Sequence, residues 1–128
     1  VFLLLTALNT EGLSGYFDGR PNLEGRAAFL RSEPGQDHAA FLLLDNAIIR
    51  ADEISQRVRE GYLVRTRSDI ETYEAKVEDY ARAEAAFSSG AQIVSTDFYR
   101  AGNAYGTDFV VTLPGGGSVR CNPVNSPC

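Results

Sequence analysis

The chain lacks two of the twenty amino acids and is poor in two more. Among its 128 residues there is no methionine and no tryptophan, and there is one lysine and one histidine. Since it begins with Val1 and contains no methionine, we expect a mature fragment, an excised domain or part of a longer gene product. The single histidine, His38, cannot by itself supply a histidine pair for general acid–base catalysis. It follows Asp37 in a turn-rich segment, which predicts an exposed or locally bonded loop side chain.

Long apolar runs are missing as well. The opening segment, Val1–Leu8, holds eight residues of which one is threonine, far short of the roughly 20 needed to span a bilayer. It also lacks the basic start and the small-residue cleavage site of a signal peptide. We therefore expect Val1–Thr6 to form a strand that is buried on both faces.

Positive charge is scarce relative to negative charge. Twelve lysines and arginines stand against 17 acidic residues, which gives a net charge of −5. This balance argues against nucleic-acid binding, which needs a basic surface, and weakens the case for a broadly cationic membrane-binding surface. Eleven of the 12 cations are arginine. That bias reflects either a GC-rich genome or the recognition of phosphate by planar guanidinium groups.

Only two cysteines are present, Cys121 and Cys128, and both lie in the tail RCNPVNSPC. A disulfide between them would close a short, proline-stiffened loop and would suit an oxidising compartment. Two unpaired thiols, or pairing with cysteines outside this sequence, are the alternatives. The spacing of the two cysteines does not match a zinc site.

What the chain does contain is a repeated strand–helix pattern. The segments Tyr62–Asp69 and Ala91–Tyr99 both start apolar and end polar, and a long amphipathic helix is predicted between them over Ile70–Ser89. Strand, helix and strand at this interval predict a parallel βαβ unit. Its core-facing stripe is expected to consist of Ile70, Tyr73, Val77, Tyr80, Ala81 and Phe87.

The same period extends over the whole chain. Four main strands are expected to start near residues 1, 27, 62 and 92, about 30 residues per unit, as in an eight-unit α/β barrel of about 250 residues. Four units make half a barrel in a single domain over residues 1–128. Half a barrel leaves two strand edges open, so we expect a missing half or a second chain to close it.

Shorter elements complete the prediction. A short helix is expected over Glu11–Phe17, a helix over Ile48–Arg59, and a strand or the approach to a helix over Phe41–Leu44. Residues 109–113 and 118–120 flank the sequence PGGG, which predicts a C-terminal hairpin.

Strand alternation sorts the polar side chains into faces. The face that becomes polar toward the C-terminal end of each strand is expected to line the barrel, and the apolar face to pack on helices. At one mouth of the barrel this places Arg31, Glu33, Arg65, Arg67, Ser95 and Asp97.

Three arginines with carboxylates in a concave site suit a phosphate or a polyol phosphate. Arginine binds phosphate through two parallel hydrogen bonds, and a carboxylate accepts hydrogen bonds from hydroxyl groups. An internal salt-bridge network without a ligand is the alternative. Of the aromatic residues, Tyr99 is best placed to line the mouth. Asp45, Asp52 and Glu53 do not follow an EF-hand pattern and predict a helix start and a solvated helix face.

Four strings carry a family resemblance: GYLVRTRSDIETYEA, SSGAQIVSTDFY, VTLPGGGSVRCNPVNSP and the earlier RSEPG. From about Gly25 onward the chain resembles the C-terminal part of the secreted, calcium-dependent phosphoinositide phospholipases C, members of the phospholipase-C-like phosphodiesterase superfamily. The resemblance implies an irregular (β/α)8 barrel, of which this chain is the C-terminal half.

The resemblance also implies an activity. Enzymes of this family cleave the phosphodiester between diacylglycerol and inositol phosphate with a histidine pair and a calcium ion, and most of those groups belong to the first half of the barrel. This chain alone is therefore expected to be inactive. The implied ligand is a phosphoinositide or inositol phosphate, met transiently at a membrane surface, and the implied location is extracellular.

Carried over position by position, the motifs imply substrate-positioning roles for Arg65, Arg67, Asp69, Asp97 and Glu33, whereas Arg31 stands where a small polar residue is expected. A glycerophosphodiester phosphodiesterase is an alternative, which the RCNPV string disfavours. A non-catalytic polyol-phosphate binding module, or a degenerate barrel fragment, is the other.

Overall fold

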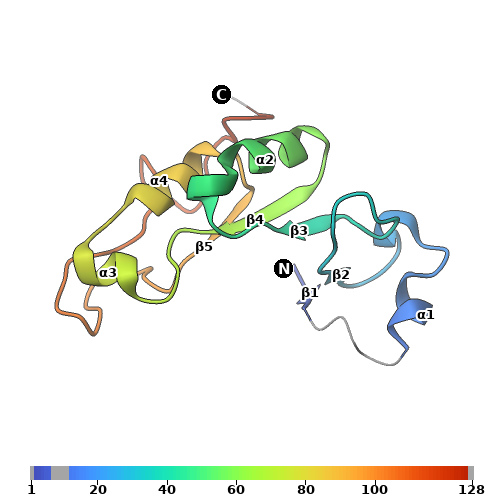
Figure 1. The fold of residues 1–128 in the computed structure, drawn as a ribbon, viewed down its shortest axis with the longest axis horizontal. Coiled ribbons are helices and arrows are strands. Elements are labelled where there is room, and N and C mark those ends of the chain that lie inside the picture. The colour runs from blue at the N-terminus through green and yellow to red at the C-terminus, as the bar shows by residue number, and fades with distance from the viewer. Residues whose placement is uncertain (1, 7–11, 127–128) are drawn as a thin grey trace. The chain divides into compact units, whose positions relative to one another are not determined.

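The computed structural model describes residues 2–6 and 12–126. The chain divides into two compact units, Val1–Leu43 and Leu44–Cys128. Because each unit is described on its own, the single domain predicted over residues 1–128 stays a prediction. Both units mix helices with parallel strands, as the α/β prediction requires (Figure 1).

The first unit is built on a short parallel strand pair. Strand β1 (Leu4–Leu5) pairs with β2 (Phe29–Leu30), and helix α1 (Leu13–Phe17) and the 3-10 turn η1 (Pro21–Leu23) lie between them in sequence. Strand β3 (Phe41–Leu43) follows, and a single parallel bridge joins its first residue to Arg31. The core of this unit is apolar and consists of Leu23, Leu30, Ala39, Phe41 and Leu42.

The burial predicted for the opening strand is wrong. Phe2 is 61% exposed, and Leu3 and Leu5 are also exposed. Among the described residues β1 pairs with β2 alone, so its other edge and much of its side-chain surface face solvent. Strand β2 and the short helix α1 occur where the sequence predicted them, although Glu11 lies outside the described residues.

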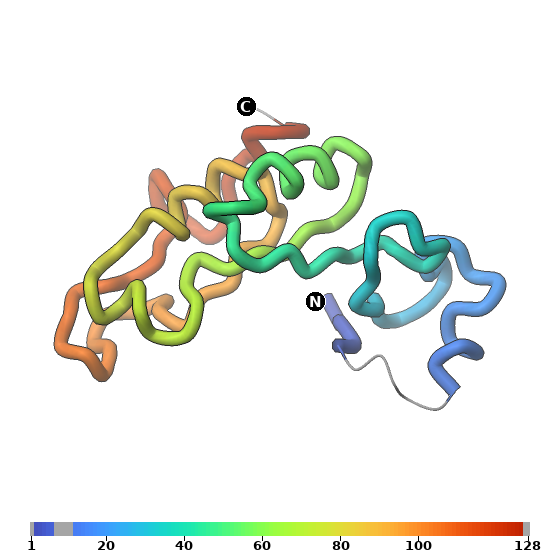
Figure 2. Tube along the Cα trace, viewed as in Figure 1, coloured from blue at the N-terminus to red at the C-terminus, as the bar shows by residue number. Residues whose placement is uncertain are grey.

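The second unit contains the predicted parallel βαβ arrangement. Strand β4 (Leu63–Arg67) pairs in parallel with β5 (Ile93–Ser95), with Arg67 opposite Ser95. Helices α2 (Ala47–Arg59) and α4 (Ala81–Ser88) pack on each other and on β4, and Figure 1 shows both on the same side of the strands. Figure 2 follows β4 and β5 side by side. The parallel pairing predicted from the 30-residue spacing is confirmed.

The single long helix predicted over Ile70–Ser89 is wrong. It is divided into α3 (Tyr73–Val77) and α4, and Glu78 between them has a left-handed φ of 54°. Asp79 Oδ1 accepts the amide of Ala81 at 2.9 Å. Such a local side-chain bond competes with a continuous helix and favours a new helix start.

The predicted apolar stripe changes with this break. Tyr73 is 62% exposed, and Val77 and Tyr80 are exposed as well. A left-handed residue interrupts the helical phase, so the face defined before Glu78 does not continue after it. The buried apolar positions on α3 and α4 are instead alanines, Ala75, Ala83 and Ala86, and Glu74 on α3 is buried as well.

The predicted C-terminal hairpin does not form. A turn closes where Gly116 donates its amide to Leu113 O at 2.9 Å, but residues 109–113 and 118–120 make no strand ladder. Phe109 is fully buried and stacks on Tyr80 with ring centroids 4.6 Å apart. Because Phe109 packs on Tyr80, residues 109–113 contribute to the core and do not pair with another strand.

The C-terminal tail packs tightly against the end of α4. Asn122 Nδ2 donates to Gly90 O at 2.7 Å, and Arg120 donates to the carbonyl of Phe87. A Cβ at Gly90 would lie 2.3 Å from Val124 Cγ2, so no other residue fits there without a shift. The small residue at the end of the helix thus lets the tail approach the backbone.

Cys121 in this tail is disulfide-bonded, and no cysteine in the described part of the chain is free. Cys128 lies outside the described residues, so the predicted Cys121–Cys128 pairing stays a prediction. Within residues 2–6 and 12–126, no helix combines the length and the apolar character needed to cross a membrane.

Candidate functional site

Four charged side chains of the second unit form two ion pairs along strand β4 and at its C-terminal end. Asp45 stands just before α2, Arg65 and Arg67 belong to β4, and Asp97 lies two residues beyond β5. Arg65 Nη1 lies 2.9 Å from Asp45 Oδ1, and Arg67 Nη2 lies 3.2 Å from Asp97 Oδ2. We call Asp45, Arg65, Arg67 and Asp97 the charged row.

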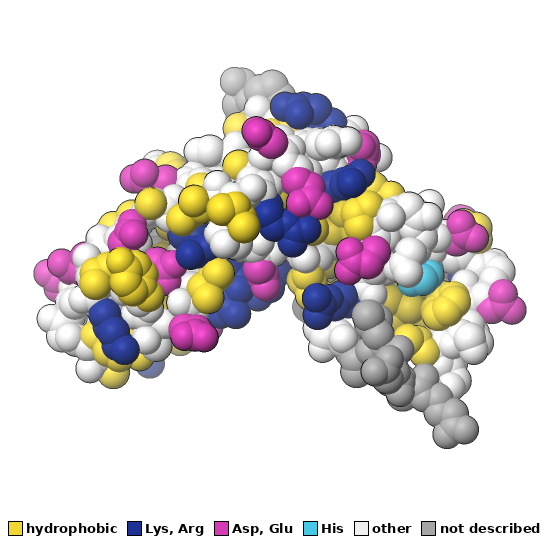
Figure 3. Space-filling model, viewed as in Figure 1, with side chains coloured by type: hydrophobic (Ala, Val, Ile, Leu, Met, Phe, Trp, Pro, Cys, Tyr) yellow, Lys and Arg dark blue, Asp and Glu magenta, His cyan; other side chains and the backbone are white. Residues whose placement is uncertain are grey.

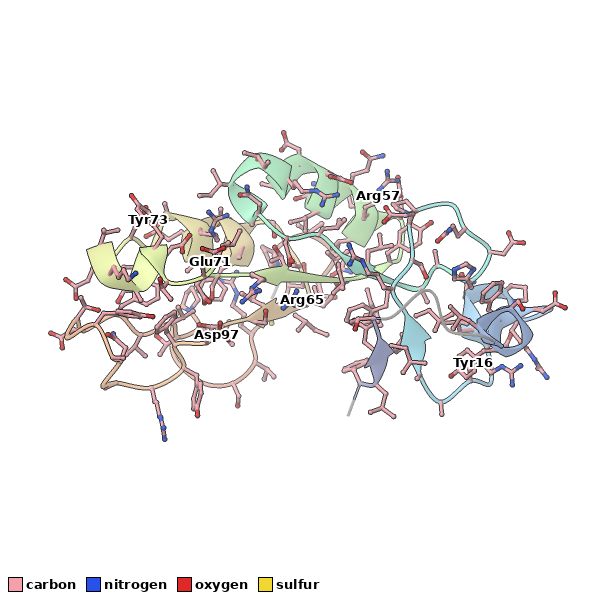
Figure 4. The ribbon with its side chains drawn as sticks, turned by 60° about the horizontal axis from the view of Figure 1, so that its bottom comes forward. Tyr16, Arg57, Arg65, Glu71, Tyr73 and Asp97 are labelled. Carbon is pink, nitrogen blue, oxygen red and sulfur yellow. The ribbon has the colours of Figure 1, made fainter. Side chains whose placement is uncertain are left out.

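The alternation of β4 explains which side chains belong to the row. Val64 and Thr66 are fully buried on the face that packs on the helices. Arg65 and Arg67 point to the opposite face, and Figure 4 shows Arg65 and Asp97 on the side of β4 away from α2. The predicted division of this strand into an apolar helix-packed face and an arginine face is therefore confirmed.

Within the row, the arginines are more buried than the carboxylates. The side chains of Arg65 and Arg67 are 23% and 30% exposed, whereas those of Asp45 and Asp97 are 46% and 68% exposed. The acidic groups are thus more open to solvent than the cations. Figure 3 shows cationic and acidic side chains interspersed on the face in view.

Arg67 carries an unused donor. Its Nε is buried and has no hydrogen-bond partner among the residues that the structure describes. A buried donor without a partner costs roughly 1–3 kcal/mol, and an anionic oxygen beside Arg67 would supply the missing acceptor. The guanidinium therefore has hydrogen-bonding capacity beyond its pair with Asp97.

A buried polar link holds the two strand ends together. Ser68 Oγ lies 2.7 Å from Asp69 Oδ2 and 3.1 Å from Ser95 O, and the amide of Asp97 donates to Asp69 Oδ1 at 3.4 Å. Ser68 and Asp69 are both fully buried. Asp69 therefore accepts a hydrogen bond from the backbone of Asp97. Its predicted substrate-positioning role stays a prediction.

The remaining predicted site residues lie in different surroundings. Ser95 is half-buried on β5, and its Oγ donates to Thr66 O at 3.4 Å. Glu33 and Arg31 are exposed residues of the first unit, and the amide of Glu33 donates to Gln36 Oε1 at 2.8 Å. Because the units are described separately, Glu33 and Arg31 are not placed relative to the charged row.

Sequence reasoning missed Asp45. It was expected at a helix start, which is correct because Asn46 precedes α2, but its pairing with Arg65 was not foreseen. The signal was present in the order of residues, since Asp45 directly follows the apolar run Phe41–Leu44. It therefore repeats the apolar-then-polar pattern that singled out Arg67 and Asp97.

A cavity of about 690 Å³ runs along β5 and the C-terminal tail. Its lining is mostly apolar and includes Ile93, Leu113 and Val119. Tyr99, predicted to line a mouth, is exposed and lies on the cavity wall. His38 lies in a turn of the first unit and stacks on Phe17 with ring centroids 4.5 Å apart, as expected for a loop histidine.

Parallel strands, helices on one face and a row of paired charges at the strand ends define an α/β protein with a polar strand-end site. A family model described as phosphoinositide phospholipase C, Ca²⁺-dependent, matches residues 1–123. The chain belongs to this family, which confirms the resemblance seen in its motifs. Searches among curated proteins and among solved structures found no match.

The family is calcium-dependent, and the described residues do not fit a calcium site. No group of three or more His, Cys, Asp or Glu side chains among them could hold a metal ion. In the charged row, Asp45 and Asp97 each pair with an arginine, whereas calcium takes six to eight oxygen ligands.

Proposed function

We propose that this chain is the substrate-positioning C-terminal half of a phosphoinositide phospholipase C barrel. The observation that carries the proposal is the charged row, in which two arginines of β4 pair with two carboxylates and the Arg67–Asp97 pair stands at the C-terminal ends of the parallel strands β4 and β5. Strand C-terminal ends are where α/β barrels bind their substrates.

Each member of the row has a distinct task in this proposal. Arg65 and Arg67 bind the phosphate of an inositol phosphate, and the buried Nε of Arg67 gains the acceptor it lacks. Asp97 accepts a hydrogen bond from a ring hydroxyl. Asp69 orients Asp97 through the amide of Asp97. In this proposal Glu33 keeps the substrate-positioning role that its motif implies.

The bond-breaking groups belong elsewhere in this account. The histidine pair and most calcium ligands would come from the N-terminal half of the barrel, or from a second chain that closes it. Exposed apolar side chains at and just before β1, and the apolar cavity beside β5, support such a closure, because large exposed apolar surfaces mark contact sites.

An extracellular location and transient contact with a membrane surface complete the proposal. The disulfide at Cys121 supports it, since disulfides persist in oxidising compartments.

Calorimetry tests the binding role. Myo-inositol 1-phosphate is expected to bind the chain, or its complex with the N-terminal half. Arg67→Ala is expected to weaken binding by about 1.5–3 kcal/mol, about 10- to 150-fold. The control is Arg59→Ala, which removes an exposed arginine from the end of α2. Equal affinity of the wild type and Arg67→Ala would leave only a structural salt-bridge role for the row.

A hydrolysis assay separates a catalytic half from a non-catalytic binding module. The chain alone is expected to release no inositol phosphate from phosphatidylinositol, with or without calcium, because its only histidine stacks on Phe17 in a turn. The complex with the N-terminal half is expected to release it. Binding without turnover in that complex would favour the non-catalytic module.

A further inference from the structure

We propose that Asp45 is a specificity-determining residue of this site. Its carboxylate accepts a hydrogen bond from a ring hydroxyl, so that the charged row selects a polyol phosphate over bare phosphate. This inference rests on the proposed function and adds to it a residue and a selectivity that the family motifs do not indicate.

The first argument is that Asp45 has bonding capacity to spare. Asp45 Oδ1 pairs with Arg65 at 2.9 Å, and no hydrogen bond to Oδ2 is found among the described residues. The side chain is 46% exposed. A carboxylate accepts up to about four hydrogen bonds, so Asp45 can hold Arg65 and accept from a ligand at the same time.

The second argument is that Asp45 is held in place from both sides. Leu44, which precedes it, donates its amide to Arg65 O at 3.0 Å. Asn46, which follows it, accepts from Arg82 Nη1 at 2.6 Å and has a left-handed φ of 66°. A fixed acceptor loses little conformational freedom when a ligand binds.

The third argument is charge balance. Two arginines and two aspartates give the row a formal charge of zero. Inorganic phosphate would meet guanidinium groups already paired with carboxylates, and it would be repelled by Asp45 and Asp97. A polyol phosphate meets the same arginines but brings hydroxyl donors for the two carboxylates. The acidic members of the row therefore disfavour the bare anion and favour the hydroxylated one.

Asp45→Asn tests the inference because the two ligands should respond in opposite directions. The substitution keeps the size of the side chain, removes the negative charge and replaces one acceptor with a donor. Calorimetry is expected to show inorganic phosphate binding about threefold to fivefold more tightly, and myo-inositol 1-phosphate about fivefold more weakly. Asp45→Ala, which removes both acceptors, is expected to change the affinities in the same directions.

The control is Asp52→Asn, which removes the same charge from an exposed position on α2. It should leave the ratio of the two affinities unchanged, and thermal melts should show all variants folded. Asp45→Asn weakening both ligands in proportion, or leaving the ratio unchanged, would overturn the role of Asp45 while the proposed function stands. A wild-type chain and complex that bind neither ligand would overturn both.

Discussion

Asp69, fully buried at the end of β4, accepts a hydrogen bond from the backbone amide of Asp97 beyond β5. Ser68 reinforces the link, since its amide and its Oγ both lie 3.1 Å from Ser95 O. The two strands are thereby held together just where Arg67 meets Asp97. A buried polar pair at the strand ends thus sets the geometry of the exposed charged pair.

Replacing Asp69 should reveal this support. Asp69→Ala leaves the amide of Asp97 without its acceptor and removes one of the two acceptors of Ser68 Oγ, so urea unfolding is expected to show a loss of about 1–3 kcal/mol. Asp69→Asn keeps an acceptor and should cost less. The exposed Asp52→Ala should change stability by less than about 0.5 kcal/mol. If Asp69→Ala is as stable as the Asp52→Ala control, the hydrogen bonds of Asp69 do not contribute to the free energy of unfolding.

Glu74 should make the second unit sensitive to acid. Burial alone would raise the pKa of Glu74, but hydrogen bonds from Arg82 at 2.5 Å and from the amide of Ile70 outweigh it, so the pKa lies below its ordinary value of 4.5. A lowered folded-state pKa stabilises the protein above the unfolded-state pKa, and this contribution disappears as the pH falls through the folded-state pKa.

Urea unfolding at pH values from 3 to 7 tests this coupling. In Glu74→Gln the free energy of unfolding should be lower at neutral pH by about 1–3 kcal/mol and should fall less steeply below pH 4.5 than in the wild type. Glu84→Gln, at an exposed site on α4, is the control. Parallel pH profiles for the wild type and Glu74→Gln would contradict the assignment.

Gly90 should be intolerant of a side chain for two separable reasons. Gly90 and Gly61 both have left-handed φ values, 83° and 94°, so alanine strains the backbone at either position by about 1 kcal/mol or more. Only at Gly90 would the added Cβ also collide with Val124, while Gly61 has open space around it. Thermal melts should therefore show a larger loss for Gly90→Ala than for Gly61→Ala, and equal losses would argue against close packing of the tail.

The tail should contain no free thiol. Titration of the denatured, unreduced chain is expected to find none, because Cys121 is disulfide-bonded and the chain has one other cysteine. Reduction is expected to lower the free energy of unfolding by about 2–3 kcal/mol, as for a short closed loop. Two titratable thiols in the monomer would contradict the predicted pairing.

The faces of β4 could be predicted from the sequence because the alternation of a strand depends on local geometry alone. Val64 and Thr66 had to oppose Arg65 and Arg67 whatever lay around them. The break at Glu78 could not be predicted, because helical spacing continues on both sides of it and glutamate is a good helix former. The hydrogen bond that Asp79 accepts from the amide of Ala81, and that favours a new helix start, becomes visible only in the structure.

Contacts between residues far apart in the sequence could not be predicted either. A polar residue such as Asp69 is expected at the surface, but its buried carboxylate accepts hydrogen bonds from Ser68 and from the amide of Asp97, which is 28 residues away. The ion pair of Asp45 is likewise long-range, because its partner Arg65 lies 20 residues further along the chain. The RTR motif identified Arg65 and Arg67 as candidate site residues. Which carboxylate each arginine pairs with depends on how the strands pack together.

The central claim is that Arg67 binds the phosphate of an inositol phosphate, and its side-chain Nε–H offers the most direct reporter. A proton–nitrogen NMR spectrum of the arginine side chains, recorded during titration with myo-inositol 1-phosphate, should show the Arg67 Nε–H resonance moving as its unused donor gains an acceptor. The resonance of the exposed Arg59 should stay in place. An Arg67 resonance that does not move at a saturating ligand concentration would contradict the account.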